Sequence, residues 1–217
     1  MPTLREMKVV LRPLLDKRPD LALHRQFLFY APFAHVFRGV WFQQSRWGGH
    51  FTVEPIATLL CDRLEVQSHP FLEGARLFKM LPDEPWDEKA SQELRDFVEN
   101  CALPKVQPID NLRKLRRKWM TPLGTAAIAC LRGDYDRAYK LTEDSVSFAT
   151  NDVAEMFSNG SVMGFRHDDY TWRSMYLHHL IKTDRSKIPE QLLEWERQAV
   201  IDTKLTKYWK PTPFDEA

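Results

Sequence analysis

Histidine, cysteine and carboxylate side chains in the first third of the chain are of types that can catalyse reactions. Cys61 ends a stretch of strand-forming residues, and His35 and His50 precede it. Nucleophilic catalysis by cysteine needs a base within about 3 Å of the thiol, and histidine often serves as that base. One hypothesis is therefore an enzyme with a dispersed active site around His35, His50 and Cys61, with Glu54 as a further titratable group. The alternative is that Cys61 is a buried structural thiol.

Other chemical motifs are missing from the sequence. It contains no GxGxxG, GxxxxGK, HExxH, GxSxG or paired CxxC pattern. The residues closest to a metal-ligand pattern are His167, Asp168 and Asp169, followed by His178 and His179. Ten helical residues rise about 15 Å, so the two groups cannot share an ion. We therefore assign no catalytic residue, no metal site and no cofactor, and we expect His179 to pack on an apolar helix face while His178 faces water.

A glycine-rich loop between two predicted strands carries candidate binding residues. Gly48 and Gly49 allow the positive φ angles of a hairpin loop, and Arg46, Trp47 and His50 lie beside them. Tryptophan and arginine are enriched among the residues that contribute most to binding between proteins. The loop is therefore one predicted contact with a partner, and the alternative is that Trp47 folds onto the sheet.

A run of basic residues is the second predicted contact. Five cations fall within six positions of a predicted helix: Arg113, Lys114, Arg116, Arg117 and Lys118. Such a helix face can contact phosphates, but it can also be a solvated face or a surface for an acidic partner protein. Because the net charge is only +1, the solvated or acidic-partner interpretation is favoured over nucleic acid.

The composition bounds the class of protein. The chain has 217 residues, of which 43% are hydrophobic and 12% aromatic, enough for one large domain with its own core. Its 31 basic and 30 acidic residues nearly cancel, so no long-range field attracts nucleic acid or a membrane. Three cysteines without CxxC spacing indicate reduced thiols. No long apolar run and no secretory leader are found, so we expect a soluble cytoplasmic protein and a single domain over 1–217.

The first third of the chain has the composition of a sheet. Aromatic and β-branched residues with partial alternation predict strands over 27–30, 36–42 and 51–54, and a short fourth strand over 75–80. The glycine loop pairs the second and third strands antiparallel. We therefore expect a small antiparallel sheet of three to four strands within about 24–82.

Helices are predicted before and after this sheet. The spacing of Leu4, Met7, Leu11 and Leu14 predicts a short first helix that Pro13 kinks or ends. Further helices are predicted at 87–103 (ending before Pro104), 109–119, 122–132 (capped by Thr121), 134–146 (capped by Asp134), 151–158, 169–182 and 186–202.

The predicted fold class is therefore α+β, with the N-terminal sheet packed against a larger C-terminal helical bundle over about 86–205. The remaining 206–217 form an extended tail with three aromatic residues and two prolines. We expect these rings to pack on the body of the protein, and the alternative is a tail that docks on a partner.

Two parts of the chain resemble known families. Residues 126–145, with Leu131-Arg132-Gly133-Asp134-Tyr135, look like the helix-turn-helix centre of one tetratricopeptide repeat. No second copy follows at the 34-residue period, so an isolated helical hairpin is expected instead of a solenoid. The run from Pro32 to Val53, together with Leu193-Glu194-Trp195-Glu196 and the closing 209–214, is similar to small uncharacterised bacterial domains, some of them immunity proteins of toxin systems. That resemblance implies a bacterial cytosolic protein with a partner, and it carries over no functional residue.

The sequence therefore favours a non-catalytic intracellular protein-binding protein, immunity-like or regulatory, whose partner is another protein, with an acidic partner suited to the basic run. The dispersed active site is the alternative function, and nucleic-acid binding through 113–118 is the third. Binding is favoured because each candidate catalytic residue also has a structural explanation, whereas Arg46, Trp47 and the basic run have none.

Overall fold

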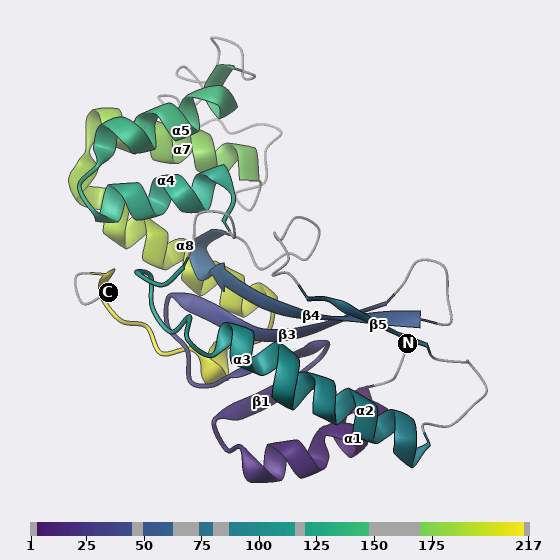
Figure 1. The fold of residues 1–217 in the computed structure, drawn as a ribbon. Helices are drawn as coiled ribbons and strands as arrows, with labels where there is room; N and C mark the ends of the chain where they lie inside the picture. The colour runs from purple at the N-terminus through teal and green to yellow at the C-terminus, as the bar shows by residue number, and fades with distance from the viewer. Residues whose placement is uncertain are drawn as a thin grey trace.

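A computed structural model of the chain describes residues 4–44, 50–62, 74–79, 87–115, 120–147 and 170–214. In these residues an antiparallel sheet, mostly N-terminal, packs with helices that are mostly C-terminal (Figure 1). The fold is therefore α+β, as the sequence predicts. None of the helices within the described residues has the length and apolar character needed to span a membrane.

The strands lie across the sheet in the order of the sequence. They are β1 (Leu21–His24), β2 (Phe27–Tyr30), β3 (Val36–Gln44), β4 (His50–Leu59) and β5 (Arg76–Lys79), each antiparallel to the next. All four predicted strands are confirmed. β1 was not predicted, because Arg25 and Gln26, which connect it to β2, are not typical hairpin-turn residues, although Arg25 adopts a φ of 53°.

β4 continues five residues beyond its predicted end, through Pro55. The N–H of Leu60 donates to the carbonyl of His35 at 2.9 Å, so the even-numbered residues of β4 bond to β3 and the odd-numbered ones face β5. β5 pairs only with residues 50–53. The nitrogen of Pro55 therefore lies beyond the end of β5, where a strand needs no N–H donor.

Both faces of the sheet are buried. On one face, the larger apolar cluster includes residues from α1 (Leu4–Lys17), α2 (Glu88–Phe97), the π-helical turn Val98–Ala102 and α3 (Leu103–Val106). On the other face, aromatic side chains of β2 and β3 pack with Ala199 and Val200 of α8 (Ile188–Asp202). Three further helices, α4 (Pro122–Leu131), α5 (Tyr135–Ser147) and α7 (Tyr170–Thr183), lie together at one end of the sheet (Figure 1).

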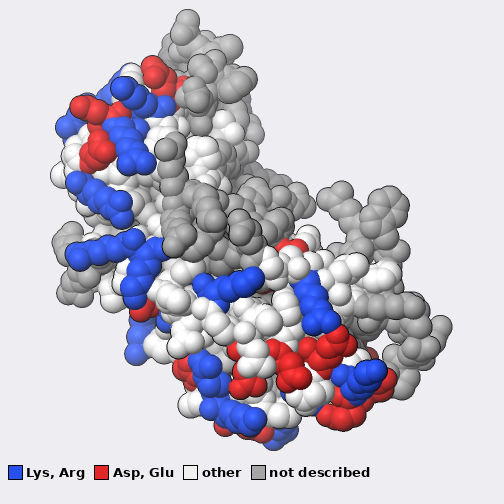
Figure 2. All heavy atoms as spheres, in the orientation of Figure 1, with Lys and Arg blue, Asp and Glu red and all other residues white. Residues whose placement is uncertain are grey.

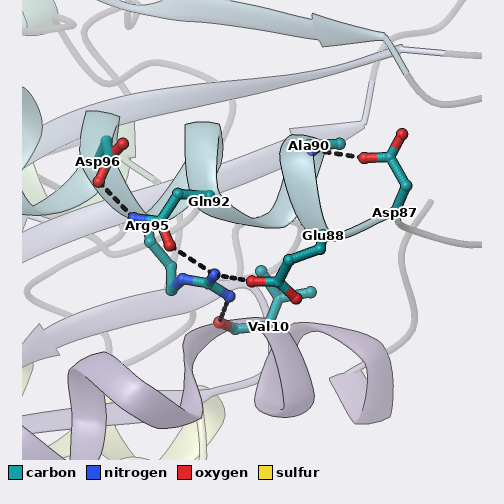
Figure 3. A network of polar contacts seen from close by, with 7 residues as sticks. All are labelled: Val10, Asp87, Glu88, Ala90, Gln92, Arg95 and Asp96. Atoms are coloured by element: carbon teal, nitrogen blue, oxygen red, sulfur yellow. Dashed lines mark hydrogen bonds and ion pairs between the residues drawn. The ribbon is translucent and has the colours of Figure 1, made fainter.

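Two prolines that were predicted to end helices lie inside helical segments. α1 continues past Pro13 to Lys17. Pro13 is exposed. In the turn before it, the carbonyl of Val10 accepts a hydrogen bond from Arg95 of α2 at 3.2 Å, so this carbonyl has a partner outside α1 (Figure 3). A π-helical turn precedes Pro104, which lies in the first turn of α3. Because proline clashes with the carbonyl four residues before it, a wider turn at that point accommodates the ring.

The predicted helix over 109–119 is not formed in its described part. Residues 109–115 lie in turns and bends, although Ile109, Leu112 and Leu115 are all buried. The Asn111 side chain accepts hydrogen bonds from the N–H groups of Arg113 and Lys114. Such a side-chain turn competes with helix formation, so the three-residue spacing reflects burial without a helix. Residues 116–119 lie outside the described residues.

The predicted helical hairpin after Thr121 is confirmed. α4 (Pro122–Leu131) begins at a Thr121 N-cap and ends before Gly133, which has a φ of 76°, and Asp134 caps α5 (Tyr135–Ser147). α7 (Tyr170–Thr183) and α8 match two of the three later predicted helices. The predicted helix over 151–158 lies outside the described residues.

The carboxylate of Asp62 joins the sheet to this hairpin. Asp62 ends a short 3₁₀ turn after β4 and accepts hydrogen bonds from the N–H of Thr121, at 3.1 Å, and from its hydroxyl. Burial raises the pKa of Asp62 to about 7, and the Thr121 hydrogen bonds oppose that rise. A Cβ on Gly124 would lie 2.3 Å from the carboxylate, so only glycine allows this close approach.

The aromatic tail packs on the body of the protein, as predicted. The Phe33 N–H donates to Tyr208, and the Lys210 N–H donates to Phe33. The Phe214 ring stacks on His35 with centroids 4.0 Å apart. The tail therefore covers the edge of the aromatic cluster.

Replacing Gly39 by alanine should destabilise the protein more than replacing Gly133. A Cβ at Gly39 would lie 2.2 Å from the Leu28 carbonyl oxygen, which the strand pairing holds in place, whereas a Cβ at Gly133 meets nothing within 4 Å. We expect Gly39→Ala to lower the free energy of unfolding by about 3 kcal/mol and Gly133→Ala to lower it by about 1 kcal/mol, because of the positive φ alone. Urea unfolding followed by circular dichroism checks the ranking, and equal losses would contradict it.

Candidate partner-binding site

The predicted binding residues are only partly within the described structure. Arg46 and Trp47 lie outside the described residues, and so do Arg116, Arg117 and Lys118. His50 is the first residue of β4. Lys114 forms an ion pair with Asp110 at 2.8 Å, and Arg113 is exposed in the same turn.

The alternative active site is not assembled around Cys61. His50 and Leu59 are the two ends of β4, so roughly 30 Å separates His50 from the Cys61 end of the strand. His35 lies nearer, but its ring is bound elsewhere: Nδ1 lies 3.0 Å from Glu196, and Nε2 lies 3.1 Å from the Thr212 hydroxyl. Neither histidine is therefore placed as a base for the thiol.

The environment of Cys61 also opposes formation of a thiolate. The side chain is buried, and burial, together with the nearby carboxylates Glu196 and Asp62, raises the pKa of the thiol well above its ordinary value. A cysteine nucleophile requires the opposite shift. Cys61 therefore has the properties of a structural thiol.

The environments predicted for the two neighbouring histidines of α7 are wrong, because His178 and not His179 is the buried one. His178 is buried, with Nδ1 3.0 Å from the Thr142 hydroxyl of α5, and its ring packs on Tyr139. His179 is partly exposed. The prediction chose the wrong residue because several faces of α7 are buried, so the apolar spacing does not mark a single inner face. Among the described residues, no group of three histidine, cysteine or acidic side chains is placed to hold a metal ion.

Glu54 is a buried carboxylate on the aromatic face of the sheet. It lies opposite Trp41 in the β3–β4 pairing, and its Oε2 has no hydrogen-bond partner. Burial alone raises its pKa to about 7 from its ordinary value of 4.5. Among the described residues no other titratable group contributes to this shift, so we expect Glu54 to change the stability of the protein with pH.

An open groove lies where α1 passes the edge strand β1. Its volume is about 870 Å³, and its lining includes Arg5, Lys8 and Arg12 of α1, residues 21–23 of β1, and Tyr208. The three cations are exposed. Arg12 pairs with Asp16 at 3.7 Å, whereas Arg5 and Lys8 form no ion pair with any other described residue. We call this feature the basic groove.

The opposite flank of α1 has a different charge pattern. Arg95 of α2 bonds to Glu88, to Gln92 and to the Val10 carbonyl of α1 (Figure 3). Acidic side chains gather over the region of α2 on the face shown in Figure 2, in agreement with the α2 sequence Glu88-Lys89-Ala90-Ser91-Gln92-Glu93-Leu94-Arg95-Asp96. One flank of α1 is therefore a balanced, internally bonded surface, and the other is a groove in which Arg12 pairs with Asp16 while Arg5 and Lys8 have no ion-pair partner among the described residues.

The basic groove could not be identified from the sequence, because β1 was not predicted and the order of strands in the sheet is a property of the whole fold. The one available sign was the spacing of Arg5, Lys8 and Arg12, which places three cations on one side of the first helix.

Comparison of the chain with protein-family models, with curated proteins and with solved structures finds no match. The two family resemblances therefore remain predictions.

Only one of the three cysteines should react rapidly in the folded protein. Cys101 is exposed, whereas Cys61 and Cys130 are buried and burial raises the pKa of both thiols. Because the thiolate is the reactive form, we expect iodoacetamide at pH 8 to label Cys101 first and the other two only after denaturation. Mass spectrometry of timed samples measures this, and early labelling of Cys61 would revive the active-site hypothesis.

Replacing Glu54 by glutamine should stabilise the protein at alkaline pH. Because the folded pKa is raised above the unfolded value, the native state holds the proton more tightly, and wild-type stability is lost as pH rises from about 4.5 to about 7. With an allowance for solvent screening, we expect Glu54→Gln to gain about 2 kcal/mol at pH 8.5 and almost nothing at pH 4. Chemical denaturation at both pH values tests this, with the exposed Glu99→Gln as control; an equal gain at both pH values would contradict it.

Proposed function

We propose that the protein is a non-catalytic binding protein whose basic groove takes an acidic segment of another protein. The observation that carries this proposal is the combination of an open groove of about 870 Å³ with the cations Arg5 and Lys8, which have no ion-pair partner among the described residues. Exposed cations at the rim of an apolar groove attract carboxylates and exclude basic segments, which gives specificity.

Two further features support binding over catalysis. Val9, in the wall of the groove, has 70% of its surface exposed, the largest exposure of any large apolar side chain among the described residues. Apolar surface beside charged residues is common where partners dock. The described residues that line the groove include no histidine or cysteine, so they offer cation and apolar contacts instead of a nucleophile and base.

The groove is preferred over the described part of the basic run 113–118 because it places two cations without an ion-pair partner among the described residues beside an apolar hollow. Lys114 is already bound to Asp110, and Arg113 lies in a turn and not on a helix. Nucleic acid is a less suitable ligand for the groove, since a single short row of cations meets few phosphates, and tight binding needs many such contacts.

Charge reversal of the groove should abolish selection of acidic peptides. We expect a random dodecapeptide display library, selected on the full chain, to yield sequences rich in aspartate and glutamate. Binding of these peptides should weaken at least about tenfold in the triple variant Arg5→Glu, Lys8→Glu, Arg12→Glu and also weaken with added salt.

A matched triple variant on the α4–α5 hairpin controls for net charge. Arg132, Arg137 and Lys140 are exposed, and their replacement by glutamate gives the same change in charge far from α1. We expect this control to bind as the wild type does. Equal loss in both variants, no acidic enrichment, or selective binding of a DNA or RNA oligomer in place of peptides would overturn the proposed function.

A further inference from the structure

Strand β1 presents unpaired backbone groups to the basic groove. The N–H of Ala31 donates to Asp20 at 2.9 Å, and Ala22 lies opposite Phe29. In an antiparallel ladder the bonded residues alternate, so residues 20, 22 and 24 bond to β2, and residues 21 and 23 face away from it. The Leu21 N–H bonds to Arg18, which leaves the Leu21 carbonyl and both backbone groups of Leu23 directed at the groove.

The walls of the groove lie on opposite faces of the sheet. α1 contributes to the larger apolar cluster, whereas Tyr208 packs against the aromatic cluster on the other face. Both line the same groove, together with residues 21–23. The free edge of β1 therefore lies between a helix on one side and a tyrosine ring on the other.

The cations of α1 match the spacing of side chains along an extended chain. Arg5, Lys8 and Arg12 are separated by three and four residues, or about 4.5 and 6 Å along the helix axis. Alternate side chains of a strand are about 6.8 Å apart and point to the same side. An extended segment in the groove can therefore place successive carboxylates near successive cations.

We propose that the partner segment binds as an added β-strand against the free edge of β1, with acidic side chains at alternate positions facing α1 and apolar side chains at the intervening positions facing Tyr208. This inference rests on the proposed function and specifies its mode. Backbone hydrogen bonds to Leu21 and Leu23 hold the segment, and contacts of its side chains with α1 and Tyr208 determine which sequences bind.

A second copy of this chain does not fit the same edge. β1 has the sequence Leu21-Ala22-Leu23-His24 and carries no carboxylate for the cations of a neighbour. Pairing of two β1 edges would also bring two rows of α1 cations toward one another, and like charges repel. Exposed edges invite such self-pairing unless charge prevents it, so the charge of α1 favours an acidic partner over self-association.

The test uses backbone methylation of a defined peptide. The probe is an acetylated, amidated heptapeptide of alternating glutamate and valine, titrated into the full chain and followed by calorimetry. Two modified probes carry N-methyl groups on the odd-numbered or on the even-numbered amides, because only one edge of an added strand bonds to β1. We expect one modified probe to bind like the parent and the other to bind at least about tenfold more weakly.

The outcomes separate the mode of binding from the proposed function. Equal binding of both modified probes, with loss in the triple charge-reversal variant, would support binding of an acidic segment in the basic groove and would overturn strand addition. Equal loss of binding for both modified probes, or no binding of the parent at millimolar concentration, would also overturn it.

A pair of protein variants tests the same backbone hydrogen bonds by changing β1 instead of the peptide. Leu23→Pro removes the outward N–H without breaking a bond to β2, and Leu23→Ala keeps that N–H. We expect the proline variant to bind the parent probe about tenfold more weakly than the alanine variant, with both folded by circular dichroism. A wild-type dimer that the proline substitution makes monomeric would show that a second copy occupies the edge, which overturns the proposal.

Discussion

The position of the helical bundle depends on the buried carboxylate of Asp62. A buried carboxylate is costly unless hydrogen bonds replace its hydration, and the first residue before α4 supplies two of them. A helix start also carries unpaired N–H groups and a partial positive charge, so it is a favourable neighbour for a carboxylate. Next to Asp62, the Cys61 carbonyl accepts a hydrogen bond from the buried Arg173 of α7 at 3.1 Å, and that guanidinium lies over the Trp195 ring of α8. One end of β4 thus holds three helices that are distant in sequence.

The elements predicted well from the sequence are those specified by neighbouring residues. Thr121 before Pro122, and Asp134 after Gly133, mark helix ends through local hydrogen bonding and backbone conformation, and the structure has both. The failures have a common physical origin. Pro13 was interpreted as the kink or end of a helix and Pro104 as a helix end, and the third strand was predicted to end before Pro55, but each proline lies where the surrounding structure needs no N–H or provides a wider turn. The buried residues 109–115 show that apolar spacing records contact with a core and not the backbone conformation that achieves it.

Less of the candidate site than of the fold could be predicted from the sequence. Which strand lies at the edge of a sheet is decided by pairings across the whole fold, and nothing within Leu21-Ala22-Leu23-His24 marks it as an edge. The same holds for His35, which looked like a candidate base and is instead bound by Glu196 and Thr212, residues that lie 161 and 177 positions away. A residue's chemistry is visible in sequence, but its availability depends on partners that only folding brings together.

The tail contacts also constrain how the chain acquires its structure during synthesis. The aromatic face of the sheet is made by residues 27–60, yet part of its cover comes from residues 199–209. A ribosome adding about 5–20 residues per second needs roughly 7–30 s to deliver that cover. A sheet that forms before this cover is made exposes its phenylalanine and tryptophan side chains to the surrounding solution. We therefore expect the nascent chain to depend on a holding chaperone at the ribosome until α8 and the tail emerge.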